Sequence, residues 1–232
     1  MGDEKYIIKA KDVKKSFGVT SALQGANLEI RRGEILAIMG PSGSGKSTLL
    51  YCLAGIFKPD SGEVWFDGKR LDQMDEKKRT ELRRLDFGFV FQFGQLVPEL
   101  TAEDNIVLPL LLDKVGRGAA YGKAKSWFKR LGIEGLEKHR TGEMSGGQSQ
   151  RVALARALVI KPKIIFADEP TGSLDSLASE QVMELLVSVA REQGTTVVLV
   201  THDPRIAAYA DREIMVRDGK VMTAQRKAEV VS

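Results

Sequence analysis

Four short apolar or β-branched runs divide the chain, and helical patterns separate most of them. The runs are Ile35–Met39, Phe87–Phe91, Ile164–Ala167 and Thr195–Thr201. Between the last two, apolar residues at positions 182, 185, 186 and 189 repeat at helical spacing, and Gly194 follows as a stop signal. Continuously apolar strands separated by helices are typical of a parallel sheet covered on both faces. The pattern therefore predicts an α/β fold with a mainly parallel sheet core.

The N-terminal stretch predicts strands of a different kind. Tyr6–Val13 contains an apolar run, and Leu28–Ile30 leads through Arg32-Gly33 into the first of the four runs. Asp67-Gly68 lies between two short segments of strand character, which is the signal for a two-residue hairpin. Because hairpins join antiparallel strands, we expect an N-terminal antiparallel β portion beside the parallel core.

The pattern becomes helical from residue 93 to residue 161. Apolar residues recur at helical spacing through Ala102–Leu112 and Ala124–Leu131, and Ser149–Ile160 has the pattern of an amphipathic helix. Loops are predicted at residues 115–118 and 132–142, and no strand pattern interrupts the region. We therefore expect one domain, residues 1–232, with an inserted, mostly helical subdomain at residues 93–161.

The composition indicates where the protein is found in the cell but not what it does. Of the 232 residues, 43% are hydrophobic and 28% are charged, and the formal net charge is +4. No apolar run approaches the roughly 18 residues of a membrane span, and the first residues lack the apolar core of a signal peptide. A cytoplasmic chain with a solvated tail after about Thr223 is expected. The single cysteine, Cys52, lies in an apolar helical context and is expected to be a buried structural thiol.

The strongest chemical signal directly follows the first apolar run. It consists of Gly40, Pro41, Ser42, Gly43, Ser44, Gly45, Lys46, Ser47 and Thr48. The pattern G-x-x-x-x-G-K-[ST], between a predicted strand and a predicted helix, is that of a loop that wraps around phosphate groups. Its glycines allow backbone N–H groups to converge on an anion at a helix N-terminus. Lys46 is expected to reach the β- and γ-phosphates of a nucleoside triphosphate, and Ser47 to ligate Mg²⁺.

Three further candidate side chains follow the later runs. Asp168 and Glu169 close the run Ile164–Ala167, and His202 follows the last run. Ligands of open α/β sheets bind at the carboxyl ends of the strands, so these groups should meet the nucleotide. Asp168 is expected to hold hydrated Mg²⁺, Glu169 to polarise the attacking water, and His202 to hydrogen-bond the γ-phosphate. His139 has no such placement and is expected to be structural.

A second feature suited to an anion lies inside the predicted helical subdomain. The residues Ser145, Gly146, Gly147 and Gln148 open the amphipathic helix. Serine is a good N-cap residue, and the two glycines expose backbone N–H groups. Since the first loop already holds the phosphates of one nucleotide, the economical hypothesis is that this helix start serves a nucleotide held by another copy of the chain. A plainly capped helix is the alternative.

Together these motifs resemble those of the ABC-type ATPases, the nucleotide-binding subunits of ATP-binding-cassette transporters, over about residues 7 to 222. Residues Gly40–Thr48 resemble the Walker A loop, Ile164–Asp168 the Walker B strand, and Met144–Gln148 the signature L-S-G-G-Q with Met in place of Leu. The resemblance implies an ABC-type cassette of the P-loop fold, with an ATPase activity that requires Mg²⁺. It also implies catalytic roles for Glu169, His202 and Lys46.

The same resemblance assigns three residues that the patterns alone did not single out. Gln92 matches the glutamine of the Q-loop, which implies contact with the γ-phosphate and Mg²⁺. Asp175 ends the Ser-Leu-Asp of the D-loop. Phe17 falls where the family stacks an aromatic ring, commonly Tyr, on adenine, so the stacking surface is kept and the hydroxyl is lost. The family further implies a homodimer that forms on ATP and shares its two sites.

Within the family, Phe89–Gln92, Leu108–Leu110 and Ala167–Asp175 resemble the lipoprotein-releasing and macrolide-exporter group. This implies an exporter or mechanically acting system. A regulatory ATPase that controls a cell-envelope enzyme and an amino-acid-importer cassette remain open as alternatives. Nucleic-acid and chromosome relatives carry long coiled-coil insertions, zinc modules or tandem cassettes. This chain has no heptad run, one cysteine and one Walker A loop, so no nucleic-acid partner is expected.

The implied partners are integral-membrane permease subunits, which would place the chain peripherally on the inner face of the cell membrane. Cargo recognition lies in the permease, so this chain names no cargo. A permease segment is expected to dock near Gln92–Leu100. There, Phe93 and Leu96 are among several apolar residues that exceed what a short loop facing water needs. The alternative for each of these residues is that it closes the core of the helical subdomain.

Overall fold

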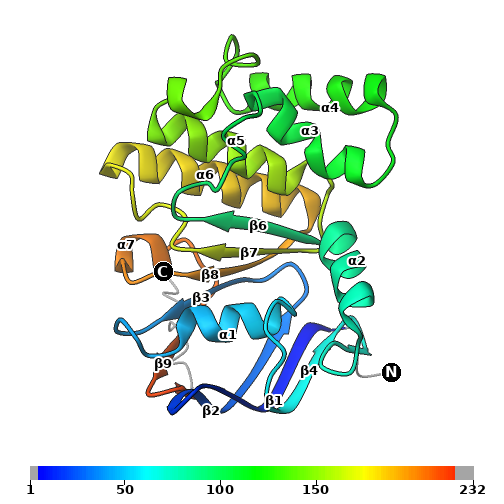
Figure 1. The fold of residues 1–232 in the computed structure, drawn as a ribbon. Coiled ribbons are helices and arrows are strands. Elements are labelled where there is room, and N and C mark those ends of the chain that lie inside the picture. The colour runs from blue at the N-terminus through cyan, green and yellow to red at the C-terminus, as the bar shows by residue number, and fades with distance from the viewer. Residues whose placement is uncertain (1–4, 223–232) are drawn as a thin grey trace. The chain divides into compact units, whose positions relative to one another are not determined.

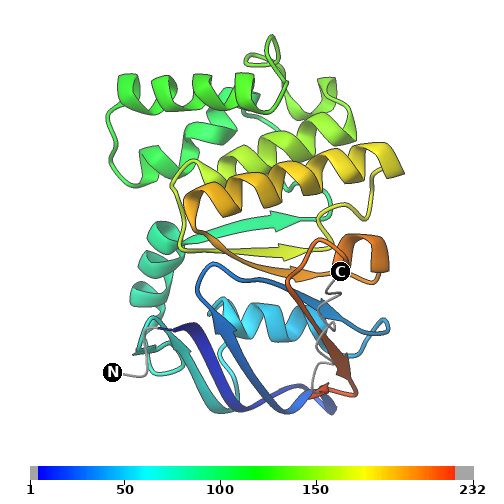
Figure 2. The same cartoon turned by 180° about the vertical axis from the view of Figure 1, so that it is seen from behind.

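The structure is a computed structural model that describes residues 5–222, so the tail predicted after Thr223 lies outside the described residues. The chain divides into two compact units. Residues 1–79 and 196–232 make up the first unit, and residues 80–195 the second. Each is described by itself (Figures 1 and 2).

The first unit begins with the predicted antiparallel β portion. Strand β1, Tyr6–Phe17, pairs antiparallel with β2, Thr20–Arg31, and with β4, Ser61–Phe66. The short strand β5, Lys69–Arg70, completes this sheet in the order β2-β1-β4-β5. The turn between β4 and β5 is the Asp67-Gly68 turn that the sequence predicts.

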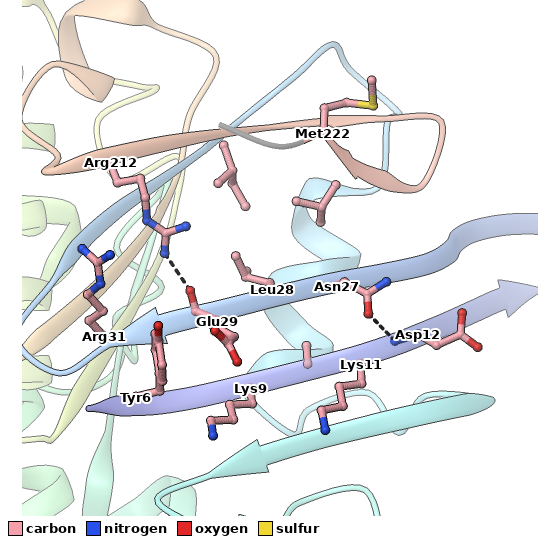
Figure 3. Close-up of a pocket in the computed structure, with 13 residues that line it drawn as sticks. Tyr6, Lys9, Lys11, Asp12, Asn27, Leu28, Glu29, Arg31, Arg212 and Met222 are labelled. Atoms are coloured by element: carbon pink, nitrogen blue, oxygen red, sulfur yellow. Dashed lines mark hydrogen bonds between the residues drawn. The ribbon is translucent and has the colours of Figure 1, made fainter. Parts of the chain in front are cut away.

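A register shift interrupts the pairing of β1 with β2 between Ala10 and Val13. At this point Asp12 has a positive φ of 47°, and its backbone N–H donates to Oδ1 of Asn27 over 3.1 Å. The guanidinium of Arg212 separately donates to the carbonyl oxygen of Glu29, which ties β9 to β2 (Figure 3). These bonds satisfy backbone groups that the bulge and the strand edge would otherwise leave without a partner.

The parallel part of the first unit is built around β3, Ile35–Met39. This strand runs parallel to β8, Thr196–Val200, on one side and to β9, Arg212–Arg217, on the other. Strand β10, Lys220–Met222, pairs antiparallel with β9. Helix α1, Lys46–Leu53, packs against β2 and β8, and the short helix α7, Pro204–Ala207, packs near β3. Most residues of β3 and all of β8 are buried, as their apolar patterns predict.

The second unit combines a parallel strand pair with helices. Strand β6, Phe87–Phe91, pairs in parallel with β7, Ile164–Asp168. The helices are α3, Ala102–Leu112; α4, Arg117–Arg130; α5, Gly146–Leu158; and α6, Ser176–Gln193. A short 3₁₀ turn, Thr141–Glu143, precedes α5. Helix α5 packs against β6, α3 and α6, which places it at the centre of this unit (Figure 1).

Two helices differ from the sequence-based expectation. Helix α4 begins at Arg117, so the loop predicted at residues 115–118 is shorter than expected. The first turns of α4 contain Gly118, Ala119, Ala120 and Gly122, whose small side chains give no clear apolar stripe. Helix α2, Glu76–Asp86, has no buried residue and was not predicted for the same reason. Apolar periodicity identifies only helices that bury a face.

The single cysteine is a structural thiol, as expected. Cys52 on α1 is 1% exposed, and burial raises the pKa of its thiol to about 12. Since the thiolate is the reactive form, this side chain is inert near neutral pH.

Candidate functional site

The phosphate loop of the first unit joins β3 to α1, as the sequence predicts. Gly40 has a φ of 146°, and a Cβ there would lie 2.2 Å from the carbonyl oxygen of Val216. Gly45 has a φ of 103°, and a Cβ there would lie 2.4 Å from the carbonyl oxygen of Ala22. Neither position has room for a side chain, so both glycines are required by the path of the loop.

Helix α1 begins differently from α5 and α6, whose starts also carry candidate residues. Its N-cap is Gly45, which offers no side-chain acceptor, and its first turn holds no acidic residue. By contrast, α5 and α6 begin with Ser145 and Asp175, and each side chain accepts a hydrogen bond from its helix. Helix α4 also starts at a glycine without a side-chain cap, but no candidate residue lies there. The N-terminus of α1 therefore keeps its partial positive charge for an external anion.

Two polar groups of the loop fit a phosphate ligand. Lys46 is 8% exposed, and its ammonium donates to the carbonyl oxygen of Pro41 over 2.8 Å, so the side chain folds back over the loop. The Ser44 hydroxyl is buried and has no hydrogen-bond partner in the structure. A buried hydroxyl without a partner costs free energy, and a phosphate oxygen would satisfy it. The donor set of the loop thus matches a polyphosphate.

His202 lies at the same edge of the sheet as the phosphate loop. Strands β3 and β8 run in parallel with Ile38 opposite Val200, and the N–H of Thr201 donates to the carbonyl oxygen of Ile38 over 3.2 Å. The loop follows β3 and His202 follows β8, so both leave the carboxyl ends of neighbouring strands. The His202 side chain is exposed. Ligands of parallel sheets bind at this edge.

Phe17 is the remaining candidate of the first unit. It ends β1, and the residue is 47% exposed although it is large and apolar. The ring meets that of Phe57 edge-on, with centroids 5.4 Å apart. An exposed aromatic ring held by a second ring is suited to stacking with a planar ligand.

In the second unit the structure brings Gln92 and Asp168 to the ends of paired strands. Phe91 on β6 lies opposite Asp168 on β7, so Gln92 follows one strand where Asp168 ends the other. The Gln92 side chain covers the backbone of Gly172, where an added Cβ would lie 2.8 Å from its Nε2. The hydroxyl of Ser173 donates to the carbonyl oxygen of Gln92 over 2.8 Å.

Glu169 follows β7 in an unusual backbone conformation. Its φ is 48°, in the left-handed region that non-glycine residues rarely adopt. The carbonyl oxygen of Glu169 accepts from the N–H of Gly172 over 3.1 Å, which closes a turn. Residues held in such conformations cluster at functional sites, where the surrounding structure compensates the strain.

Sequence reasoning missed Gln150, which connects these segments. Its side chain is buried on α5, and Nε2 donates to the carbonyl oxygens of Phe91 over 2.9 Å and Pro170 over 2.5 Å. One amide thus holds the residue before Gln92 and the residue after Glu169. A polar residue on the buried face of the predicted amphipathic helix was the available signal.

The start of α5 is self-capped. The Ser145 hydroxyl accepts from the N–H of Gln148 over 3.2 Å, and Oε1 of Gln148 accepts from the N–H of Ser145 over 2.8 Å. A Cβ added at Gly146 or Gly147 would lie 3.4 Å from Leu174 or Ala178, an ordinary van der Waals distance. Packing against these two neighbours therefore does not by itself require glycine at either position.

An open groove of about 380 Å³ lies in front of the start of α5. Its lining consists of Gly132, Ser145 to Gln148, Arg151, Ser173, Leu174, Asp175 and Ala178. Asp175 lies in this lining, and its side chain accepts from the N–H of Ala178 over 2.8 Å to cap α6. The signature and D-loop segments thus form one surface within the second unit.

The candidates fall into two sets, one in each unit. The first unit carries Phe17, the phosphate loop and His202, and the second carries Gln92, Ser145–Gln148, Asp168, Glu169 and Asp175. The predicted Mg²⁺ ligands are divided in the same way, since Ser47 belongs to the first unit and Gln92 and Asp168 to the second. Among residues 5–222, no group of three or more His, Cys, Asp or Glu side chains could hold a metal ion. The predicted ligand set has a single carboxylate and is not a group of that kind.

A separate hollow of about 680 Å³ in the first unit is lined by residues of β1, β2, β9 and β10 (Figure 3). No candidate residue lines it. Within the described part of the chain, no helix is both long and apolar enough to cross a membrane.

Comparison with known proteins adds to this geometry. The model of the family described as "ABC transporter" matches residues 23–172. The chain is 44% identical to the lipoprotein-releasing system ATP-binding protein LolD of Porphyromonas gingivalis, over 92% of this chain and 97% of that protein. It is 45% identical to the LolD protein of Bordetella pertussis, over 86% of each.

The solved structures that the chain resembles are also ATP-binding cassettes or parts of ABC transporters. A dimeric structure of the ATP-binding cassette MJ0796 in a post-hydrolysis state, bound to ADP and Pi, has a TM-score of 0.88 and 41% identity, over 95% of this chain and 99% of that one. The structure of CbiO1 from Clostridium perfringens, part of the transporter complex CbiONQ, has a TM-score of 0.86 and 36% identity, over 96% of this chain and 89% of that one.

Proposed function

Because this chain belongs to the ABC transporter family and is an ATP-hydrolysing cassette of that family, we propose that two copies of it bind ATP between them and thereby drive a membrane permease. The observation that carries the proposal is the start of α1. It lacks a side-chain cap, follows a loop whose glycines are obligatory, and is flanked by Lys46 and the unpartnered hydroxyl of Ser44. These groups fit the phosphates of ATP.

The proposed reaction assigns a task to each candidate residue. The phosphate loop, Gly40–Thr48, binds the phosphates, and Lys46 stabilises charge on the β- and γ-phosphates. Glu169 polarises the attacking water, and His202 stabilises the γ-phosphate as charge develops on it. Phe17 stacks on the adenine.

The Mg²⁺ of this site would be held by Ser47, Asp168 and Gln92. Hydroxyl, carboxylate and amide oxygens suit this hard cation, which usually keeps several waters and takes few protein ligands. When bound, Mg²⁺ neutralises charge on the phosphates. Glu169 and Gln92 lie on different segments of the second unit. The turn from Glu169 to Gly172 brings the chain to Ser173, whose hydroxyl donates to the carbonyl oxygen of Gln92 and so joins the two segments.

The dimer proposal rests on the exposed groove at the start of α5. The groove in front of α5 presents Ser145, Gly146, Gly147 and Gln148 with Asp175, while the phosphates of one nucleotide already have the phosphate loop. In a two-fold dimer, each groove would cover the nucleotide held by the other copy, which is an isologous contact. The similar cassette MJ0796 forms a dimer in its ADP- and Pi-bound structure.

The permease is the proposed membrane partner, and it would hold the chain on the cytoplasmic face of the membrane. The similarity to LolD proteins favours a lipoprotein-releasing or other export-type system that acts mechanically. A regulatory ATPase for a cell-envelope enzyme and an importer cassette are the alternatives. We also propose that residues 1–232 act as one cassette domain, with residues 93–161 as its inserted helical subdomain.

The permease contact is proposed at the segment that follows Gln92. Phe93 directly follows Gln92, a candidate Mg²⁺ ligand. It is 73% exposed, although it is large and apolar. Leu96, in contrast, is only 7% exposed and belongs to the buried core, so for this residue the alternative of closing the core holds and it offers no surface to a partner. Phe93 is therefore the contact to test.

Purification from the native membrane with a tagged chain tests the assignment most directly. A co-purifying membrane subunit with a permease architecture, together with Mg²⁺-dependent release of phosphate from ATP, is the expected result. Recovery of a cell-envelope enzyme complex in place of a permease would favour the regulatory alternative. Absence of ATPase activity in the purified complex would contradict the proposal.

A further inference from the structure

Hydrogen bonds join the segment that follows α1 to the end of β1, directly before Phe17. Asp60 makes three hydrogen bonds to consecutive residues of β1. Its N–H donates to the carbonyl oxygen of Lys14 over 2.9 Å, and its carboxylate accepts from the Lys15 ammonium and from the N–H of Ser16, each over 2.7 Å. These partners directly precede Phe17, so the Asp60 carboxylate fixes the backbone from which that ring projects.

An aromatic chain connects the same ring to α1. Phe57 meets Phe17 edge-on at 5.4 Å and an interplanar angle of 71°, and it meets Tyr51 of α1 at 5.4 Å and 89°. The N–H of Phe57 also donates to the carbonyl oxygen of Tyr51 over 3.1 Å. Since α1 starts at the phosphate loop, Tyr51 and Phe57 link the phosphate-binding helix to the exposed ring of Phe17.

One face of the Phe17 ring already has a neighbour. The ammonium of Lys15 lies over it, 5.6 Å from the centroid, and the bond to Asp60 keeps it there. Phe57 stands nearly perpendicular to the ring, and Phe17 as a whole is still 47% exposed, so part of the ring remains accessible to a planar ligand. Hydrogen bonds from Lys15 and Ser16 hold the pKa of the Asp60 carboxyl below its usual range, so the carboxylate that accepts these bonds is charged at neutral pH.

We propose that Phe57 and Asp60 are positioning residues for the nucleobase: they hold Phe17 at a set position relative to α1 and leave part of its ring accessible for stacking. This inference rests on the proposed ATP site. It explains how a phenylalanine without a hydroxyl anchor is kept in place. Both residues follow α1 and lie outside the phosphate loop in sequence, and their hydrogen bonds and ring contacts run to β1 and to Tyr51, so the two residues act on the base.

The test separates base binding from phosphate binding. Mg²⁺-ATP and Mg²⁺-tripolyphosphate are titrated calorimetrically into the full chain carrying Glu169→Gln, so that ATP is not consumed. Phe57→Ala and Asp60→Ala should each weaken ATP binding about three- to tenfold, the range of one aromatic or hydrogen-bonded contact, and leave tripolyphosphate binding unchanged. Phe57→Tyr, which keeps the ring, should restore the ATP affinity. Lys58→Ala, an exposed position between the two, serves as the matched control.

Each outcome decides the inference. Equal weakening of both ligands by Phe57→Ala and Asp60→Ala would show a general structural role and overturn it, as would unchanged ATP binding. Loss of ATP affinity alone, with rescue by Phe57→Tyr, supports it. If Lys46→Ala leaves both ligands bound as tightly as in the parent, the phosphate-loop assignment fails, and the inference fails with it.

Discussion

The side-chain amide of Gln150 donates to the carbonyl oxygen of Pro170 over 2.5 Å in the interior of the second unit. Gln150 belongs to α5, which begins with the signature residues, and Pro170 directly follows the proposed water-polarising residue Glu169. The bond therefore joins the N-terminal half of α5 to the backbone of the segment that carries Glu169.

Replacing Gln150 by leucine should destabilise the protein. The change leaves the carbonyl oxygen of Pro170 without its partner, whereas that of Phe91 still accepts from the N–H of Gly94. A buried group left unpaired costs about 1–3 kcal/mol, so we expect the free energy of unfolding, measured by urea denaturation, to fall by about that amount. Gln24→Leu at an exposed site is the control and should leave it unchanged. Equal stability of the two variants would show that the Gln150 bonds contribute nothing.

Ser44→Ala should have opposite effects on the protein and on its ligand binding. The buried Ser44 hydroxyl has no partner in the absence of nucleotide, so its removal should leave the melting temperature unchanged or raise it slightly. Affinity for ATP should fall because a phosphate contact is lost. Thermal unfolding with and without ATP measures both quantities. A lower melting temperature without ATP would indicate that the hydroxyl is satisfied within the protein.

Lys46→Ala should weaken ATP binding by about 1.5–3 kcal/mol, the typical contribution of a charge-assisted contact. Lys46 also closes the loop through Pro41, so the variant should be checked for a folded α1 by circular dichroism. Calorimetric titration with ATP is the measurement. Parent-like affinity would mean that this loop is not the phosphate site.

Glu169→Gln should bind ATP normally and hydrolyse it about 10²–10⁴-fold more slowly, because the amide cannot accept a proton from water. The substitution keeps the size of a residue in a left-handed conformation, so the turn to Gly172 should persist. Single-turnover phosphate release gives the rate. Turnover near that of the parent would remove Glu169 from the role of base.

Mixed dimers test the shared sites. Lys46→Ala removes a phosphate contact, and Ser145→Arg fills the groove in front of α5. If the sites are composite, a dimer of one chain of each kind has both lesions in one site and an intact second site. We expect the mixture to hydrolyse more ATP than either variant alone. Activity no higher than that of the separate variants, with mixing proven by two different tags, would argue for sites within single chains.

Phe93→Asp should uncouple the cassette from its permease. The side chain is 73% exposed, so the charge should be tolerated by the fold, and ATPase activity of the isolated chain should persist. Stimulation by the reconstituted permease should be lost. Leu96→Asp is a poor probe because Leu96 is buried and its replacement would unfold the region. Full stimulation of the Phe93→Asp complex would place the permease contact elsewhere.

The sequence alone determined the features that are local along the chain. Strand β6 at Phe87–Phe91 and helix α3 at Ala102–Leu112 coincide with their predicted bounds, because burial of a strand or of a helix face leaves a period in the residues themselves. The phosphate loop could be recognised in the same way, since the residues that would hold one group of phosphates are consecutive.

The tertiary structure decided which distant residues meet. That Leu96 is buried while Phe93 is exposed, that Gln150 bonds to two separate segments, and that Asp60 fixes the end of β1 all depend on contacts between elements far apart in sequence. Helix α2 and the first turns of α4 were missed because charged or small residues carry no apolar period. A one-dimensional pattern records that a position is buried or exposed on its own element. It does not record the partner, which the packing of the whole chain selects.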